Sequence, residues 1–159
     1  MNVLAVDPGF ANNGWAVLDY NTLELVDSGV ERVVEVGASD EVTCGGILAF
    51  VRRIQEQHRP IMMLIEFQGC SMLLRGVEMA FLTAAESVGI PAKVIYPLTI
   101  KSHFSSRGLS CRGNKKNKQD AIVLVQQLGY ETAISHVADC ILMVIYMREC
   151  VNTQSAAKP

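Results

Sequence analysis

Residues 3–18 read VLAVDPGFANNGWAVL, and this stretch decides the fold. The apolar run at 3–6 has the length and composition of a buried strand, and it ends on a carboxylate at Asp7. Residues 8–14 are rich in Pro, Gly and Asn, which predicts a turn, and residues 15–20 have the pattern of a second strand. The stretch therefore predicts a β-hairpin whose first strand delivers an acidic side chain to the turn.

Apolar spacing and chain-breaking residues predict the other elements. A third strand, or a bulged pair, is expected within residues 23–36, and loop composition is found at 108–118. Predicted helices cover residues 41–58, 71–88, 119–128 and 135–150. Continuous apolar runs predict strands at 61–66 and 92–96. Three strands in series followed by alternating helices and strands indicate an α/β fold, with a five-stranded mixed sheet of three antiparallel and two parallel strands flanked by helices.

Bulk properties limit the class of protein. A chain of 159 residues with 50% hydrophobic content suits one domain, expected over 1–150, with a short disordered tail over 151–159. No stretch reaches the roughly 18 consecutive apolar residues of a membrane span, and the amino terminus lacks the features of a signal peptide. We therefore expect a soluble intracellular protein. The five cysteines form no CxxC pair, so reduced structural thiols are expected rather than a zinc site or a disulfide framework.

Charge is unevenly distributed along the chain. The net charge is −2, yet six of the 14 Lys and Arg residues fall between 101 and 118, a segment without Asp or Glu. These residues are Lys101, Arg107, Arg112, Lys115, Lys116 and Lys118. The segment is either a surface that contacts phosphates or a solvated loop, and composition alone favours neither.

Three acidic residues are placed where they could meet. If the first and fourth strands are neighbours, Asp7 and Glu66 emerge at the same edge of the sheet, and the last helix can add Asp139. His136 lies three residues before Asp139, on the same helical face. Clustered carboxylates repel each other unless a cation neutralises them, so these four residues predict a site for Mg²⁺ or Mn²⁺. Turn, surface and helix-start roles are the alternatives for each residue alone, but the joint pattern favours the metal site.

These motifs resemble those of the RuvC family of Holliday junction resolvases, which have the ribonuclease H-like fold. Residues 3–18 look like the opening of that family, in which a strand delivers an Asp into Pro-Gly. Residues 64–66 resemble its second motif, and residues 136–142 resemble the motif of its terminal helix. The three motifs occur in the family's order and spacing, and the likeness covers roughly residues 3–148.

The resemblance implies a homodimer that binds branched DNA and resolves Holliday junctions by paired nicks, with two Mg²⁺ or Mn²⁺ ions at each active site. On this mapping Asp7, Glu66 and Asp139 are catalytic carboxylates that bind metal, and His136 takes a position where the family has His or Asp. A short resolvase can be bacterial or viral, so the expected location is the cytoplasm of a bacterium or of an infected host cell.

The resemblance also implies DNA contacts. Lys101 and Lys118 resemble basic residues that approach the scissile phosphate or the junction backbone, and Lys118 is the expected catalytic lysine. Which lysine of 115–118 faces the phosphate stays open. Many family members have an aromatic residue three positions after the second-motif Glu, where this chain has Gly69, and Phe67 is expected to contact DNA instead. Further DNA contacts are expected from Arg107, Arg112, Lys115 and Lys116.

The helix at 71–88 carries an apolar stripe with two possible roles. Its members are Met72, Leu73, Val77, Phe81 and Ala84. In the family this helix pairs across the dimer axis, but the stripe could equally cover the sheet of its own chain.

Two other function classes stay open. A non-cleaving module that binds junctions would bind DNA without metal-dependent turnover, and the intact acid set argues against it. A nucleotide-handling phosphotransferase is disfavoured by the chain length and by the absence of GxxxxGK[ST].

Overall fold

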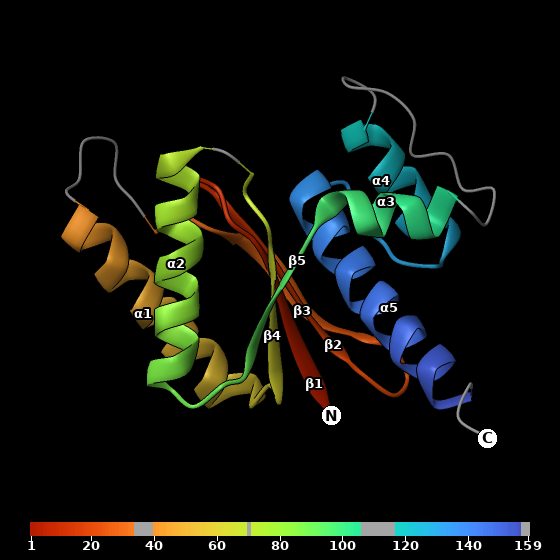
Figure 1. Ribbon diagram of the computed structural model, residues 1–159, viewed down its shortest axis with the longest axis horizontal. Helices are drawn as coiled ribbons and strands as arrows, with labels where there is room; N and C mark the ends of the chain where they lie inside the picture. The colour runs from red at the N-terminus through yellow and green to blue at the C-terminus, as the bar shows by residue number, and fades with distance from the viewer. Residues whose placement is uncertain (34–39, 70, 106–116, 157–159) are drawn as a thin grey trace.

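The sheet is the centre of the computed structural model, which describes residues 1–33, 40–69, 71–105 and 117–156 (Figure 1). Its strands are β1 (Asn2–Asp7), β2 (Asn13–Asp19), β3 (Leu25–Glu31), β4 (Met62–Glu66) and β5 (Ala92–Ile95), in the spatial order β3-β2-β1-β4-β5. The first three pair antiparallel, whereas β4 pairs parallel with both β1 and β5. The predicted α/β fold, with three antiparallel strands followed by two parallel ones, is confirmed.

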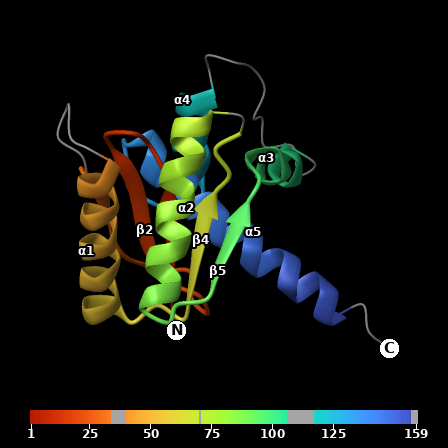
Figure 2. The same cartoon turned by 60° about the vertical axis from the view of Figure 1, so that its left-hand side comes forward.

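Helices cover both faces of this sheet (Figures 1 and 2). One face packs against α1 (Asp40–His58) and α2 (Met72–Ser87), and the other against α3 (Pro97–Ser105), α4 (Asn117–Gln127) and α5 (Ser135–Ala156). Successive side chains of a strand point to opposite faces. In β1, Leu4 and Val6 therefore join the core with α1 and α2, while Val3 and Ala5 join the core with α3, α4 and α5. The central strands β1 and β4 are apolar at residues 3–6 and 62–65 because elements pack on both of their faces, whereas β3 at the edge of the sheet carries Asp27, Ser28 and Glu31.

The apolar stripe of α2 divides between two surroundings. Val77, Phe81 and Ala84 are buried in the core with α1 and the sheet. Met72 and Leu73 are instead 90% and 61% exposed. One part of the stripe thus covers the sheet, and the other part faces outward in the isolated chain.

Two helices differ from the sequence-based expectation. No helix is expected at 97–105, yet α3 forms there, because Pro97 suits the first helical position and Ile100 and Phe104, four residues apart, bury one side. The last helix runs to Ala156, although a disordered tail is expected from residue 151; no Gly or Pro between 151 and 156 interrupts it. In the described part of the chain, no helix is long and apolar enough to cross a membrane.

Candidate active site

Two carboxylates meet at the ends of neighbouring strands. Val6 of β1 pairs with Ile65 of the parallel strand β4, so the next residues, Asp7 and Glu66, reach the same edge of the sheet. Strand alternation directs both toward the face that α5 covers, because Ala5 and Leu64, two residues earlier, lie in that core. The pairing of β1 with β4, on which the expected juxtaposition of these acids depended, is present.

The Glu66 carboxyl is held in its neutral form. Burial raises its pKa, and the charges of Asp7 and Asp139 with a hydrogen bond to Asp7 raise it further, whereas Lys101 lowers it. The resulting pKa is about 10, against an ordinary value of 4.5. Without a cation, Glu66 therefore keeps a proton at neutral pH, since burial and the neighbouring negative charges both disfavour its ionised form.

His136 enters the site from the first turn of α5. Its ring Nδ1 bonds to Oδ2 of Asp7. The approach depends on Gly14, which pairs with Asp7 across β1 and β2: a Cβ at position 14 would lie 2.3 Å from the Cβ of His136. One turn further along α5, the buried thiol of Cys140 donates to the Gly14 carbonyl at 3.4 Å. Burial raises the pKa of that thiol well above its usual value, so it stays a neutral donor.

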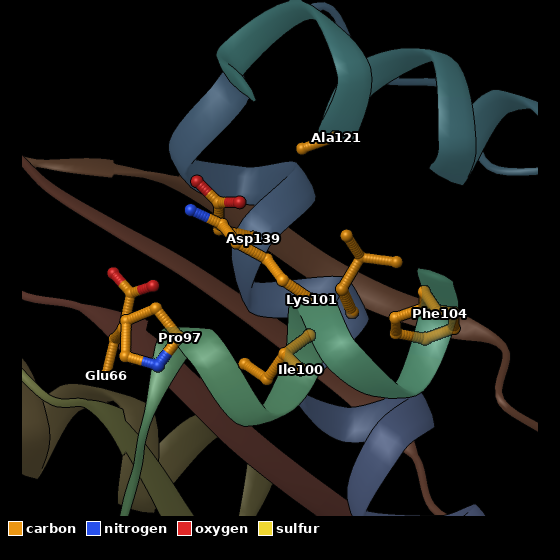
Figure 3. Close-up of a pocket in the computed structure, with 8 residues that line it drawn as sticks. Glu66, Pro97, Ile100, Lys101, Phe104, Ala121 and Asp139 are labelled. Atoms are coloured by element: carbon orange, nitrogen blue, oxygen red, sulfur yellow. The ribbon is translucent and has the colours of Figure 1, made fainter. Parts of the chain in front are cut away.

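Asp139 and Lys101 line one pocket together with Glu66 (Figure 3). Asp139 follows His136 by one turn of α5, and Lys101 comes from α3, which begins directly after β5. Figure 3 shows the Lys101 side chain extending from α3 toward Asp139. The remaining lining residues are Pro97, Ile100, Phe104, Ala121 and Leu142. The unexpected helix α3 is therefore what brings a positive charge to the acidic cluster.

Two further polar residues support Asp7, and neither is expected from the sequence. The Gln68 amide Nε2 donates to Oδ1 of Asp7 and to the Glu66 carbonyl, both at 3.3 Å. The backbone N–H of Gln68 donates to Oε2 of Glu78, a buried residue of α2, at 3.0 Å. The available signal was a single acidic residue, Glu78, inside the apolar stripe of α2.

The donor set suits a hard divalent cation. Asp7, Glu66 and Asp139 offer the carboxylate oxygens that Mg²⁺ and Mn²⁺ prefer, and His136 adds a ring nitrogen. Burial and the neighbouring charges of Asp7 and Asp139 raise the pKa of Glu66, so a bound cation would favour its ionised form. Across residues 1–33, 40–69, 71–105 and 117–156, no three His, Cys, Asp or Glu side chains already surround one point as a complete ligand set. The metal assignment therefore stays a prediction.

The residues predicted to bind DNA are described only in part. Phe67 directly follows Glu66; its ring packs against Tyr96 with 4.5 Å between centroids, and the Arg75 guanidinium carbon lies 4.9 Å from its centroid. The backbone of Lys118 is in the first turn of α4, one turn before the pocket residue Ala121. The other predicted contacts lie outside the described residues: Arg107, Arg112, Lys115 and Lys116.

Comparison with known proteins gives the fold. Neither a protein-family model nor a curated protein sequence matches the chain. Solved structures do match it: Thermus thermophilus RuvC in complex with a Holliday junction substrate has a TM-score of 0.73 at 19% identity, over 96% of each chain. The chain has a RuvC-type, ribonuclease H-like fold. Fowlpox virus resolvase with Holliday junction DNA has a TM-score of 0.59 at 17% identity, over 93% of this chain and 99% of that one. For the yeast mitochondrial Holliday junction resolvase Ydc2 the TM-score is 0.64 at 15% identity, over 96% and 80%.

Proposed function

We propose that the chain is a structure-selective DNA endonuclease that cuts Holliday junctions and related branched DNA. The observation that carries this proposal is the meeting of acidic side chains from β1, β4 and α5 at one edge of a RuvC-type sheet. Three resolvases of different origin have this fold, and two of those structures contain Holliday junction DNA. Such an activity would serve recombination and repair of DNA.

The carboxylates would act as metal ligands. In this proposal Asp7, Glu66, Asp139 and His136 hold two Mg²⁺ or Mn²⁺ ions. Two such ions would supply an activated water and would neutralise the charge on the departing oxygen. Glu66 would bind as the carboxylate, with its proton released to solvent, and His136 would orient Asp7 through its ring nitrogen. No nucleophilic side chain is needed.

Basic residues would bind the substrate. Lys101 lies beside the acidic cluster, where it can approach a phosphate oxygen on which charge develops during cleavage. Lys118 is proposed to act in the same way from α4, and the remaining bases of the 101–118 segment would neutralise phosphates along the junction arms. Phe67, at the edge of the site, would contact the bases or sugars next to the cut.

We also propose that the active form is a homodimer. Paired nicks in opposed strands require two active sites related by symmetry. The outward side of α2 offers an apolar surface for such contact, with Met72, Leu73 and Met79 all more than half exposed.

A labelled four-way junction, compared with a linear duplex of the same sequence, tests the proposal. The expected result is nicking of the junction in Mg²⁺ or Mn²⁺, no nicking in EDTA, and little action on the duplex. Tight junction binding without nicks in either metal would instead identify a binding module of the same fold. Equal cleavage of both substrates would contradict structure selectivity.

A further inference from the structure

Glu78 is buried on a helix side that is otherwise apolar. The other buried residues of α2 are Val77, Phe81, Ala84 and Ala85, whereas the Glu78 side chain is only 2% exposed. Burying a carboxylate is unfavourable unless hydrogen bonds or a counter-charge compensate for the lost water. Packing of α2 onto the sheet would be better served by an apolar residue here, so the carboxylate calls for another explanation.

The two oxygens of Glu78 have different partners. Oε1 lies 3.2 Å from Nη1 of Arg75, one turn earlier on α2, and this guanidinium is partly open to solvent. Oε2 accepts the backbone N–H of Gln68 at 3.0 Å, in the loop that follows β4. An ion pair with Arg75 could form equally well at the surface, so it does not account for the burial. The hydrogen bond from Gln68 accounts for the burial of Glu78, because it holds the loop after β4 against α2.

Gln68 passes this constraint on to the acidic cluster. With its backbone held by Glu78, its side-chain amide donates to Oδ1 of Asp7 and to the carbonyl of Glu66. The other oxygen of Asp7 bonds to His136. Both oxygens of Asp7 therefore have a hydrogen-bond partner. One partner is His136 of α5, and the other is Gln68, whose loop is held by Glu78 of α2.

We infer that Gln68 and Glu78 are positioning residues: Glu78 anchors the loop after β4, and the anchored Gln68 fixes the orientation of the Asp7 carboxylate. The inference rests on the proposed function, because the orientation of Asp7 matters for rate only if Asp7 is a catalytic ligand. Removing a hydrogen-bond partner of a metal ligand typically lowers activity by about 10–100-fold. The coupling also ties α2, whose outer side is the proposed dimer surface, to the reacting centre.

Amide hydrogen exchange of Gln68, followed by NMR, tests the anchor without any activity assay. Glu78→Ala should speed exchange at Gln68, whereas Glu78→Gln, which keeps an acceptor oxygen, should leave it slow. Phe81→Leu is the matched control, because it disturbs the buried side of α2 one turn away without touching the loop. Equal exchange at Gln68 in the wild type and in Glu78→Ala would overturn the anchor.

Single-turnover nicking of a four-way junction tests the effect on Asp7. Gln68→Ala and Glu78→Ala should each slow nicking by about 10–100-fold, with junction affinity in Ca²⁺ unchanged. Glu78→Gln should recover most of the rate, and Phe81→Leu should lower the melting temperature without slowing the folded enzyme. If Glu78 acts through Gln68, the double variant Gln68→Ala, Glu78→Ala should be no slower than the slower single variant.

The outcomes separate the two proposals. Losses that multiply in the double variant, or unchanged rates in both single variants, would overturn the positioning role while the nuclease assignment stands. A wild-type protein that nicks no junction in Mg²⁺ or Mn²⁺ would overturn the proposed function and the effect on rate with it. The exchange measurement would then still decide whether Glu78 anchors the loop.

Discussion

Gly14 and His136 lie so close that no side chain fits at position 14. A Cβ there would lie 2.3 Å from the Cβ of His136 and 2.8 Å from its backbone carbonyl carbon. Because Gly14 pairs with Asp7 across β1 and β2, the missing side chain is what lets α5 bring His136 to Asp7. A glycine in the second strand is thus required by the site rather than by a turn.

Gly14→Ala should therefore damage both stability and the site. Forcing a methyl group into packed surroundings costs about 1–3 kcal/mol, and the displaced His136 would lose its bond to Asp7. Thermal denaturation and single-turnover nicking measure the two effects. Gly45→Ala is the control, because a Cβ on this exposed glycine of α1 meets nothing within 4 Å. A Gly14→Ala protein as stable and as fast as the wild type would show that α5 tolerates a shift.

The raised pKa of Glu66 predicts an unusual dependence of stability on pH. The folded-state pKa of about 10 exceeds the ordinary 4.5, so this group favours folding most below pH 4.5, and its contribution falls as pH rises toward 10. In the absence of divalent metal, Glu66→Gln should melt higher than the wild type at pH 8, and the gap should narrow toward pH 5. For a chain of this size, each 1 kcal/mol corresponds to about 2–4 °C.

Added metal should reverse that order. Mg²⁺ or Mn²⁺ should raise the melting temperature of the wild type, because a ligand that binds only the folded state stabilises it. The same ions should act less on Glu66→Gln, which offers one carboxylate fewer. Glu56→Gln, a substitution at an exposed position of α1, should have the melting temperature of the wild type in every condition. Identical pH profiles for the wild type and Glu66→Gln without metal would contradict the buried, neutral state of Glu66.

Asp7→Asn and Asp139→Asn should abolish nicking while junction binding in Ca²⁺ stays near normal. An amide keeps the size of the side chain but does not carry the charge that holds a divalent cation. Rates and gel-shift affinities measured on the same preparations separate the two effects. Nicking at the wild-type rate by either variant would remove that residue from the active site.

His136→Ala should slow nicking less than loss of a carboxylate does. The imidazole is a neutral ligand or an orienting partner of Asp7, and water can replace part of either role. The ratio of the nicking rates in Mg²⁺ and Mn²⁺ should change, since nitrogen ligands favour Mn²⁺ over Mg²⁺. Unchanged rates in both metals would leave His136 with a structural role alone.

The basic segment should divide into two kinds of residue. Lys101→Ala and Lys118→Ala should reduce the nicking rate more than the affinity, because a cation beside the scissile phosphate acts on charge that develops during the reaction. Each Ala substitution at Arg107, Arg112, Lys115 or Lys116 should instead lower affinity and reduce the slope of log affinity against log salt by about one unit. If neutralising all six bases changed neither the nicking rate nor the junction affinity, the DNA would have to cross another surface of the protein.

The sequence was sufficient for the sheet and for two of the acids. Apolar runs in the sequence predict the strands that end on Asp7 and Glu66. The parallel pairing of β1 with β4 is the one step that the sequence does not itself predict. The sequence does not predict α3, because only Ile100 and Phe104 mark its buried side. With α3 missing, no argument from spacing could place Lys101 beside Asp139.

The supporting residues were harder to foresee. Gln68 acts from a loop through its side-chain amide, and loops have no periodicity from which a direction can be inferred. Glu78 was visible as an acid within the apolar stripe of α2, but its partner lies ten residues away on another element. Contacts of this kind are set by tertiary packing, which a pattern within one helix does not encode.

The most direct measurement labels each strand of a four-way junction in turn and maps the nicks made by the wild type and by Glu66→Gln. The wild type should cut two opposed strands at symmetry-related positions, and only with Mg²⁺ or Mn²⁺ present. Glu66→Gln should bind the same junction and leave all four strands intact. Equal nicking by Glu66→Gln, or nicking by the wild type in EDTA, would contradict a metal-dependent site built on the acids of β1, β4 and α5.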